Sequence, residues 1–284
     1  MIQGIRKKSK LKKISIILAG GLILAGVFLF ISVDNNLSVT HYTFETDKLD
    51  EPVRIALIAD LHSRLYGKEQ EELISAINEQ NPDIIVLVGD IGDEKKSNIG
   101  TIKLLEGIAD EYPCFYVLGN HEARKEKAAG FKTLFREYGV VVLDGWHEVI
   151  EINAQLINIA GADDIRAGRT RYEKQLEDAF SDIDESLFIL LLLHRPERFP
   201  QVAEYNFDLM LAGHAHGGQW RLPNKINGLY APQQGLFPKY TCGFYELDGR
   251  TMLVSRGLAN NGGIIPRIFN PPELVIVDIL PIEN

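Results

Sequence analysis

Three apolar segments of similar length recur about thirty residues apart near the middle of the chain. They read VRIALIAD at 53–60, DIIVLVGD at 83–90 and CFYVLGNH at 114–121, and each ends in polar side chains. Such short runs, rich in β-branched residues, are typical of strands buried on both faces. Between them, at 68–80 and 98–110, apolar residues recur at helical spacing. The alternation predicts an α/β fold with a largely parallel sheet covered by helices.

Polar side chains stand at the ends of these strands. Two further apolar runs, SLFILLLLHRPE at 186–197 and FDLMLAGHAHGG at 207–218, also terminate in histidine. Because parallel strands have their carboxyl ends at one edge of a sheet, these side chains are expected to converge there. The residues concerned are Asp60, His62, Asp90, Asn120, His121, His194, His214 and His216.

The residue types indicate the kind of site. Carboxylate, carboxamide and imidazole groups are oxygen and nitrogen donors that suit Mn²⁺, Fe²⁺, Zn²⁺ or Co²⁺. Seven such donors, His121 left aside, exceed the needs of one tetrahedral ion, so we expect two ions that share a bridging carboxylate. In extended backbone residues i and i+2 point the same way, so Asp60 and His62 are expected to act as a pair, like His214 and His216.

Each of these residues also has a simpler explanation. Asp90 is suited to cap a helix or occupy a turn, Asn120 to a left-handed turn position, and Asp60 to cap the segment that follows it. A single histidine after a strand, such as His194, is more often a loop residue than a ligand. None of these explanations accounts for the repeated placement at successive strand ends, and the joint pattern favours a dinuclear metal site.

The N-terminus has a different composition from the rest of the chain. Residues 1–13 carry six cations and no acid, and the uncharged segment 14–33 that follows has the length of a bilayer span. The positive-inside rule then predicts a cytoplasmic basic tail, a transmembrane signal anchor at 14–33 and a single-pass protein of the cell membrane whose main domain lies outside the cytoplasm. A cleaved signal peptide is the alternative. Residues 34–52 are expected to form a linker or first strand, and 53–284 the main domain.

The charge and the cysteine content exclude some classes of protein. The formal net charge is −9 despite the basic tail, and so acidic a domain is a poor general binder of nucleic acid. The two cysteines, Cys114 and Cys242, are too few for a disulfide framework. We therefore expect a core held by packing and no nucleic-acid partner.

Five sequence blocks together resemble the calcineurin-like metallophosphoesterases. In chain order they are DLH at 60–62, GDIGD at 89–93, GNHE at 119–122, LLLHRPE at 191–197 and GHAHGGQ at 213–219. The resemblance extends from about residue 53 to the C-terminus, whose last segments look like the membrane-associated bacterial branch that includes YkuE and YaeI. It implies a four-layer αββα sandwich of two sheets flanked by helices, here preceded by the N-terminal transmembrane helix.

The resemblance also implies a role for each motif residue. Two divalent ions are expected, with manganese favoured over zinc or iron. The implied ligands are Asp60, His62, Asp90 and His216 for one ion, and Asp90, Asn120, His194 and His214 for the other, with Asp90 as the bridge. Hydroxide that bridges the ions would attack phosphorus in line, and His121 would protonate the leaving group as general acid.

The predicted function is that of a membrane-anchored phosphoesterase that hydrolyses a phosphoester or pyrophosphate bond, as a phosphatase or a phosphodiesterase. The expected partner is a phosphorylated small-molecule or lipid-linked substrate of the cell envelope, recognised by the metals and local arginines. One alternative is a hydrolase of the UDP-2,3-diacylglucosamine type on the cytoplasmic face, as some relatives are. Another is a non-catalytic metal-dependent scaffold, against which the presence of His121 argues.

Several residues around the motifs have two possible roles. Arg64, Arg195 and Arg221 are candidates for substrate binding, and the alternative is that they are solvated side chains. The segment 227–240, rich in aromatic residues, Pro and Gly, is either a rim that shapes substrate access or a rigid surface loop. In the loop GADDIRAG, Asp163 and Asp164 are expected to be turn residues rather than further ligands.

Overall fold

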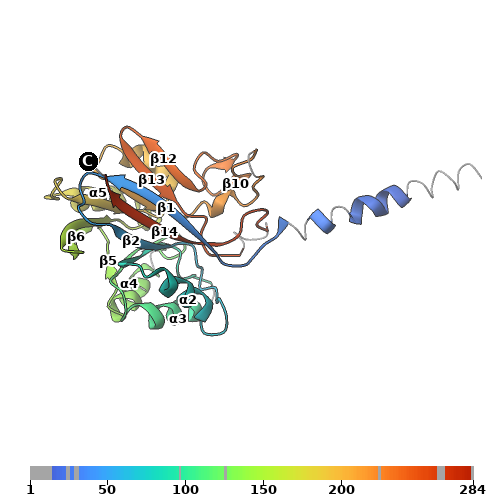
Figure 1. The fold of residues 1–284 in the computed structure, drawn as a ribbon, viewed down its shortest axis with the longest axis horizontal. Helices are drawn as coiled ribbons and strands as arrows, with labels where there is room; N and C mark the ends of the chain where they lie inside the picture. The colour runs from blue at the N-terminus through green and yellow to red at the C-terminus, as the bar shows by residue number, and fades with distance from the viewer. Residues whose placement is uncertain are drawn as a thin grey trace, which may run out of the picture.

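A computed structural model of the chain shows two sheets and the helices that cover them (Figure 1). The structure describes residues 15–23, 26–28, 32–95, 97–124, 127–222, 225–260 and 266–282. Within these ranges each of the two large sheets has six strands. Both sheets mix parallel and antiparallel neighbours, which confirms the predicted α/β fold class.

The first sheet contains the three segments that recur in the sequence. Its strands, in spatial order, are β1 (Ser38–Thr46), β14 (Glu273–Pro281), β2 (Val53–Ile58), β3 (Ile84–Val88), β4 (Cys114–Val117) and β5 (Val141–Val142). The strands β2 to β5 run parallel, whereas β14 is antiparallel to β2 and parallel to β1. All residues of β3 and β4 are buried, as their unbroken apolar sequences predict.

The second sheet contains the two later apolar runs. Its strands, in spatial order, are β12 (Gly243–Leu247), β13 (Arg250–Val254), β9 (Leu209–Ala212), β8 (Phe188–Leu192), β7 (Gln155–Gly161) and β6 (Trp146–Ile152). The four central strands are parallel, and an antiparallel strand closes each edge. A separate short hairpin pairs β10 (Tyr230–Ala231) with β11 (Gly235–Leu236).

Three apolar clusters hold the layers together. One packs α2 (Glu71–Gln80), α3 (Ile99–Ile108) and α4 (Ala128–Glu137) against the first sheet, and another packs α5 (Arg169–Phe180) and α6 (Phe199–Val202) against the second. The third lies between the two sheets and is built from the inward side chains of both. The order of layers is therefore helices, sheet, sheet, helices, and both cysteines are free thiols within it.

The N-terminal segment corrects one prediction. Residues 15–23 and 26–28 are helical, and Figure 1 shows them pointing away from the two sheets. A bilayer span requires about 20 consecutive apolar residues in a helix, and no helix in the described part of the chain is long and apolar enough. The predicted transmembrane anchor at 14–33 is therefore unsupported, and the predicted single-pass membrane location is wrong. The predicted basic tail at 1–13, like residues 14, 24–25 and 29–31, lies outside the described residues.

Candidate metal centre

The carboxyl ends of strands from both sheets meet at one place. The loops after β2 and β3 are joined by backbone hydrogen bonds, from Asp60 N to Gly89 O (3.0 Å) and from His62 N to Asp90 O (2.9 Å). The two sheets are connected by His214, which follows β9 and donates its backbone N–H to Oδ2 of Asp60 at 2.8 Å. The polar strand ends predicted from sequence therefore lie around a common site.

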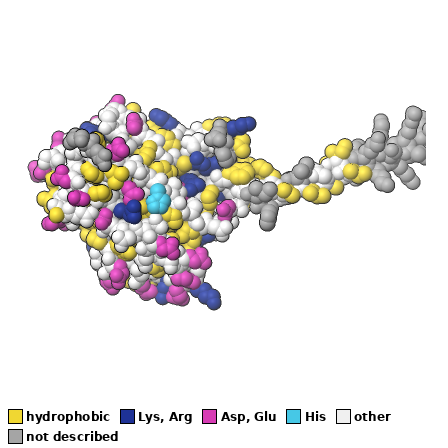
Figure 2. Space-filling view, viewed as in Figure 1, with side chains coloured by type: hydrophobic (Ala, Val, Ile, Leu, Met, Phe, Trp, Pro, Cys, Tyr) yellow, Lys and Arg dark blue, Asp and Glu magenta, His cyan; other side chains and the backbone are white. Residues whose placement is uncertain are grey.

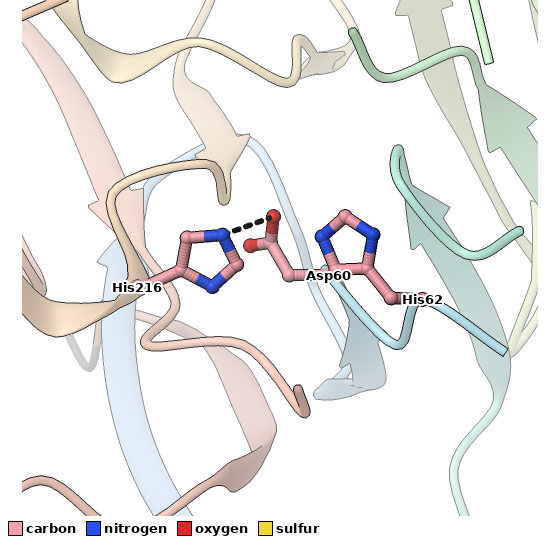
Figure 3. A group of neighbouring side chains, drawn as sticks. All are labelled: Asp60, His62 and His216. Atoms are coloured by element: carbon pink, nitrogen blue, oxygen red, sulfur yellow. Dashed lines mark ion pairs between the residues drawn. The ribbon is translucent and has the colours of Figure 1, made fainter. Parts of the chain in front are cut away.

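A first group of possible ligands contains Asp60, His62 and His216. One ligand atom from each residue lies within 4.8 Å of the other two, and all three residues are buried. Figure 3 shows the Asp60 carboxylate between the two imidazoles, with its Oδ1 atom 3.7 Å from Nε2 of His216. The rings of His62 and His216 are stacked with centroids 5.7 Å apart.

A second group contains Asp90, His194 and His214, whose possible ligand atoms are also within 4.8 Å of one another. Nε2 of His194 lies 3.4 Å from Oδ2 of Asp90 and 3.9 Å from Oδ1 of Asp60. Asn120 is buried beyond the end of β4. Its neighbour His121 donates its backbone N–H to Oδ1 of Asp90 at 2.8 Å.

The donor atoms fit divalent cations. Ligands on opposite sides of an ion with bonds of about 2.1 Å are about 4.2 Å apart, close to the spacing within each group. Oδ1 of Asp60, Oδ1 of Asn120 and Nε2 of His194 are buried and have no hydrogen-bond partner among the described residues. Buried polar atoms without a partner are unfavourable, and bound cations would provide partners for all three.

The protonation of the three histidines depends on their neighbours, and a cation that binds Nε2 of His194 would displace a proton from it. Nδ1 of His194 lies 2.9 Å from the carbonyl oxygen of Val88 and donates to it, which leaves Nε2 to face the carboxylates. Burial lowers the pKa of His194, but the charges of Asp90 and Asp60 more than offset it and raise the pKa to about 10. Burial keeps the pKa of His214 and of His216 well below the usual range, so both are neutral near pH 7.

The backbone of the site differs from the predicted extended geometry. Positive φ angles, in the left-handed region, occur at Asp60 (52°), His62 (48°), Asp90 (53°), His214 (66°) and His216 (48°). Asp and His are among the residues that tolerate this region best. The predicted extended backbone is therefore wrong, because tight left-handed turns gather the side chains, although Asp60 and His62 do lie in one ligand group as expected.

Glu122 organises the site although the sequence analysis assigns it no role. Its buried carboxylate accepts hydrogen bonds from the backbone N–H groups of Asp90 (2.9 Å), Gly92 (2.7 Å) and Gly119 (2.8 Å). Burial, together with the charge of Asp90, raises the pKa of Glu122 to about 7. Its position directly after the donors in GNHE is the one sequence signal that points to it.

Asp93 is a second residue that the sequence analysis missed. Its Oδ2 atom lies 3.4 Å from Nδ1 of His62, on the side of the ring opposite the nitrogen that approaches Asp90. A carboxylate on the far nitrogen of an imidazole orients the ring toward a metal. Asp93 also forms a third possible ligand group with His62 and His121.

His121 lies beside the two main groups. Its ring is 4.7 Å from that of His62, and Nδ1 is 4.0 Å from Oε1 of Glu94. The side chain is 35% exposed, unlike the buried imidazoles around it. Burial is the largest influence on the pKa of His121 and lowers it, although Asp90 acts in the opposite direction.

Arg195 is held inside the protein. Nε and Nη2 donate to the two oxygens of Asp164 at 2.5 Å and 3.1 Å, and the residue is buried. Asp164 also accepts the backbone N–H of Arg166, as expected of a turn residue, whereas Asp163 pairs with Lys132 at 2.7 Å. The two aspartates thus stabilise the loop after β7 through buried ion pairs.

The other two candidate arginines also have partners within the chain. Arg64 donates to the hydroxyl of Tyr66 at 2.8 Å and to the carbonyl oxygen of Asn35 at 2.9 Å. Arg221 donates to Oδ1 of Asn227 at 2.9 Å. Contact of these arginines with a substrate stays a prediction.

Gly213 allows the second sheet to approach Asp60. A Cβ atom at this position would lie 2.7 Å from Oδ2 of Asp60 and 2.7 Å from Cβ of Ala59. We expect Gly213→Ala to lower the free energy of unfolding by about 1–3 kcal/mol and to weaken metal binding. Chemical denaturation and metal titration measure the two effects.

Gly130→Ala is the matched control for this variant. Gly130 lies in α4, and a Cβ atom there would meet nothing within 4 Å. Alanine favours helix over glycine by about 1 kcal/mol, so this variant should be as stable as the parent or more stable. Unchanged stability and metal affinity in Gly213→Ala would contradict the close packing around Asp60.

The fold and the paired donor groups define the class of protein. Two facing sheets that bring carboxylate, amide and imidazole groups together at their strand ends are those of a metal-dependent hydrolase. Residues 53–218 match the family described as calcineurin-like phosphoesterase. The chain belongs to the calcineurin-like metallophosphoesterase family, which confirms the resemblance found in the sequence.

Bacterial relatives extend the match beyond the motif region. A metallophosphoesterase of Campylobacter jejuni is 30% identical over 98% of this chain and 74% of its own length. The metallophosphoesterase YkuE of Bacillus subtilis is 30% identical over 78% of this chain and 77% of its own length. A metallophosphoesterase of Aquifex aeolicus is 32% identical over 86% of this chain and 92% of its own length.

Proposed function

We propose that this protein is a phosphoesterase that binds two divalent cations and hydrolyses a phosphoester or pyrophosphate bond. The observation that carries the proposal is the position of Asp90 between the two ligand groups. Its Oδ2 atom lies 3.7 Å from Nε2 of His62 in the first group and 3.4 Å from Nε2 of His194 in the second. A carboxylate in this position is suited to bridge two ions.

The ligands of the two cations follow from these groups. The proposed sets are Asp60, His62, Asp90 and His216 for the first ion, and Asp90, Asn120, His194 and His214 for the second. Oxygen and nitrogen donors without thiolate suit manganese, zinc and iron, and of these we propose manganese. Such a pair of ions lowers the pKa of bound water and neutralises charge on phosphate oxygens.

His121 is proposed as the general acid. It is the histidine of the site that is neither in the two main groups nor fully buried, so its ring is accessible to a substrate. The negative charge of a bound phosphate favours the protonated imidazole and opposes the effect of burial on its pKa. The proton would pass from the ring to the oxygen of the leaving group.

The charge and the exposed apolar side chains of the surface favour a substrate with an apolar portion over a nucleic acid. In Figure 2 acidic side chains gather over α2 and α3, and the net charge of the chain is −9. The β10–β11 hairpin, which contacts His214 through Gln233, exposes Leu236 and Phe237 by 68% each. A phosphoester of a lipid-linked molecule would place its phosphate at the metals and its apolar group on this rim.

Metal-dependent hydrolysis tests the proposed function. The full chain, stripped with a chelator and reloaded with Mn²⁺, is expected to hydrolyse members of a panel of phosphomonoesters, phosphodiesters and pyrophosphates. Apolar substituents on the substrate should lower KM. Absence of hydrolysis of every substrate by protein that has bound its metal would contradict a catalytic role and favour a scaffold.

A further inference from the structure

One metal-ligand candidate is in contact with the rim of the site. Oε1 of Gln233 lies 2.5 Å from Nε2 of His214. An amide oxygen only accepts hydrogen bonds, so Nε2 carries the proton and donates it. The lone pair of the neutral His214 ring is then on Nδ1.

We propose that Gln233 is a positioning residue that fixes this tautomer and thereby presents Nδ1 of His214 to the second cation. The inference rests on the proposed two-cation function. His194, in the same ligand group, has the opposite arrangement, because its Nδ1 donates to the carbonyl oxygen of Val88 and its Nε2 faces the carboxylates. Each ring thus has one nitrogen held by a hydrogen bond, and the other is left to bind a cation, which at His194 would displace the Nε2 proton.

The backbone of Gln233 supports a specific role for its side chain. The residue has a φ of 58° in the turn between β10 and β11, directly after Pro232. The turn is closed by a hydrogen bond from Gln234 N to Ala231 O at 3.3 Å. Gly or Asn is usual at such a position, since other residues are strained there. Glutamine is unfavourable for the turn itself, but its length reaches His214.

In the described part of the chain the adjacent residue, Gln234, forms hydrogen bonds only within its own loop. Gln234 donates to the carbonyl oxygen of Tyr240 at 2.7 Å and accepts the backbone N–H of the same residue at 2.9 Å. It fixes the loop without a contact to the metal centre in the described residues. The pair therefore offers a matched control within one turn.

Metal titration of the full-length protein with Mn²⁺ tests the role of Gln233. Gln233→Asn keeps an amide and tolerates positive φ, but it is one methylene too short to reach His214. We expect this variant to lower the affinity for one of the two ions by about 10–100-fold and to leave the affinity for the other unchanged. Gln233→Glu, which can accept the same hydrogen bond, should retain both affinities.

Two results would overturn the proposal. One is a Gln233→Asn variant with parental affinity for both ions, and the other is a Gln234→Ala variant with the same loss as Gln233→Asn. If the parent protein itself bound fewer than two ions, the two-cation function would fail instead.

The tautomer of His214 can be observed without metal. In ¹⁵N-histidine NMR spectra of the metal-free protein, the His214 ring should be protonated at Nε2, and Gln233→Asn should yield a mixture of tautomers. Protonation at Nδ1 in the parent protein would contradict the proposal, whatever number of ions the protein binds.

Discussion

Replacing Asp90 with alanine should empty both metal sites. Oδ2 of Asp90 lies 3.7 Å from Nε2 of His62 in the first ligand group and 3.4 Å from Nε2 of His194 in the second, so we expect its loss to remove a ligand from both proposed ions. We expect the metal content to fall to near zero and the hydrolytic rate to fall by at least about 10³-fold, more than the loss of a single electrostatic contact. Elemental analysis of the purified variant measures the metal content.

The backbone contacts of Asp90 provide the control for misfolding. Alanine keeps the hydrogen bond that the Asp90 N–H donates to Glu122. It loses the one that Oδ1 accepts from the His121 N–H and is strained at a φ of 53°, so Asp90→Asn, which can keep both features, is the matched control for the fold. Asp93→Ala removes the carboxylate beside Nδ1 of His62, which belongs to the first ligand group alone. This variant should therefore lower the affinity for the first ion only. A variant at Asp90 that still held two ions would show that this residue is not the bridge.

Replacing His121 with alanine should slow catalysis without releasing metal. General-acid catalysis contributes about 10²–10⁴-fold to a rate, and we expect kcat to decrease by this factor for substrates with an alkoxide leaving group. The decrease should be much smaller for nitrophenolate, which departs without a proton. Steady-state kinetics with the two kinds of substrate measure the difference.

His41 provides a matched histidine outside the site. It lies on β1 and is exposed, so His41→Ala should change neither kcat nor metal content. An equal loss of rate for both leaving groups in His121→Ala, or a loss of metal, would assign His121 a role other than proton donation.

The strand ends could be predicted because their signals are local. The run before Asp60 and the run before Asp90 are continuous apolar segments, and the structure makes both of them strands whose ends meet. The helix at 98–110 was also predictable from the helical spacing of its apolar residues, and α3 buries Leu104, Leu105 and Ile108 among them. Hydrophobic periodicity contains this information residue by residue.

The residues around the ligands could not be predicted in the same way. Glu122 acts through three backbone N–H groups that only the folded loops bring together. Gln233 reaches His214 from a turn 19 residues further along the chain. The left-handed backbone at Asp60 and His214 depends on the close approach of the two sheets. Such contacts are set by tertiary packing, which has no periodic signature in the sequence.

Diffraction at the manganese absorption edge, from crystals grown with Mn²⁺, tests the central claim most directly. We expect two anomalous peaks in each chain, one beside Asp60, His62 and His216 and the other beside His194 and His214, with Asp90 in contact with both. A single peak, or two peaks of which only one touches Asp90, would contradict the dinuclear centre.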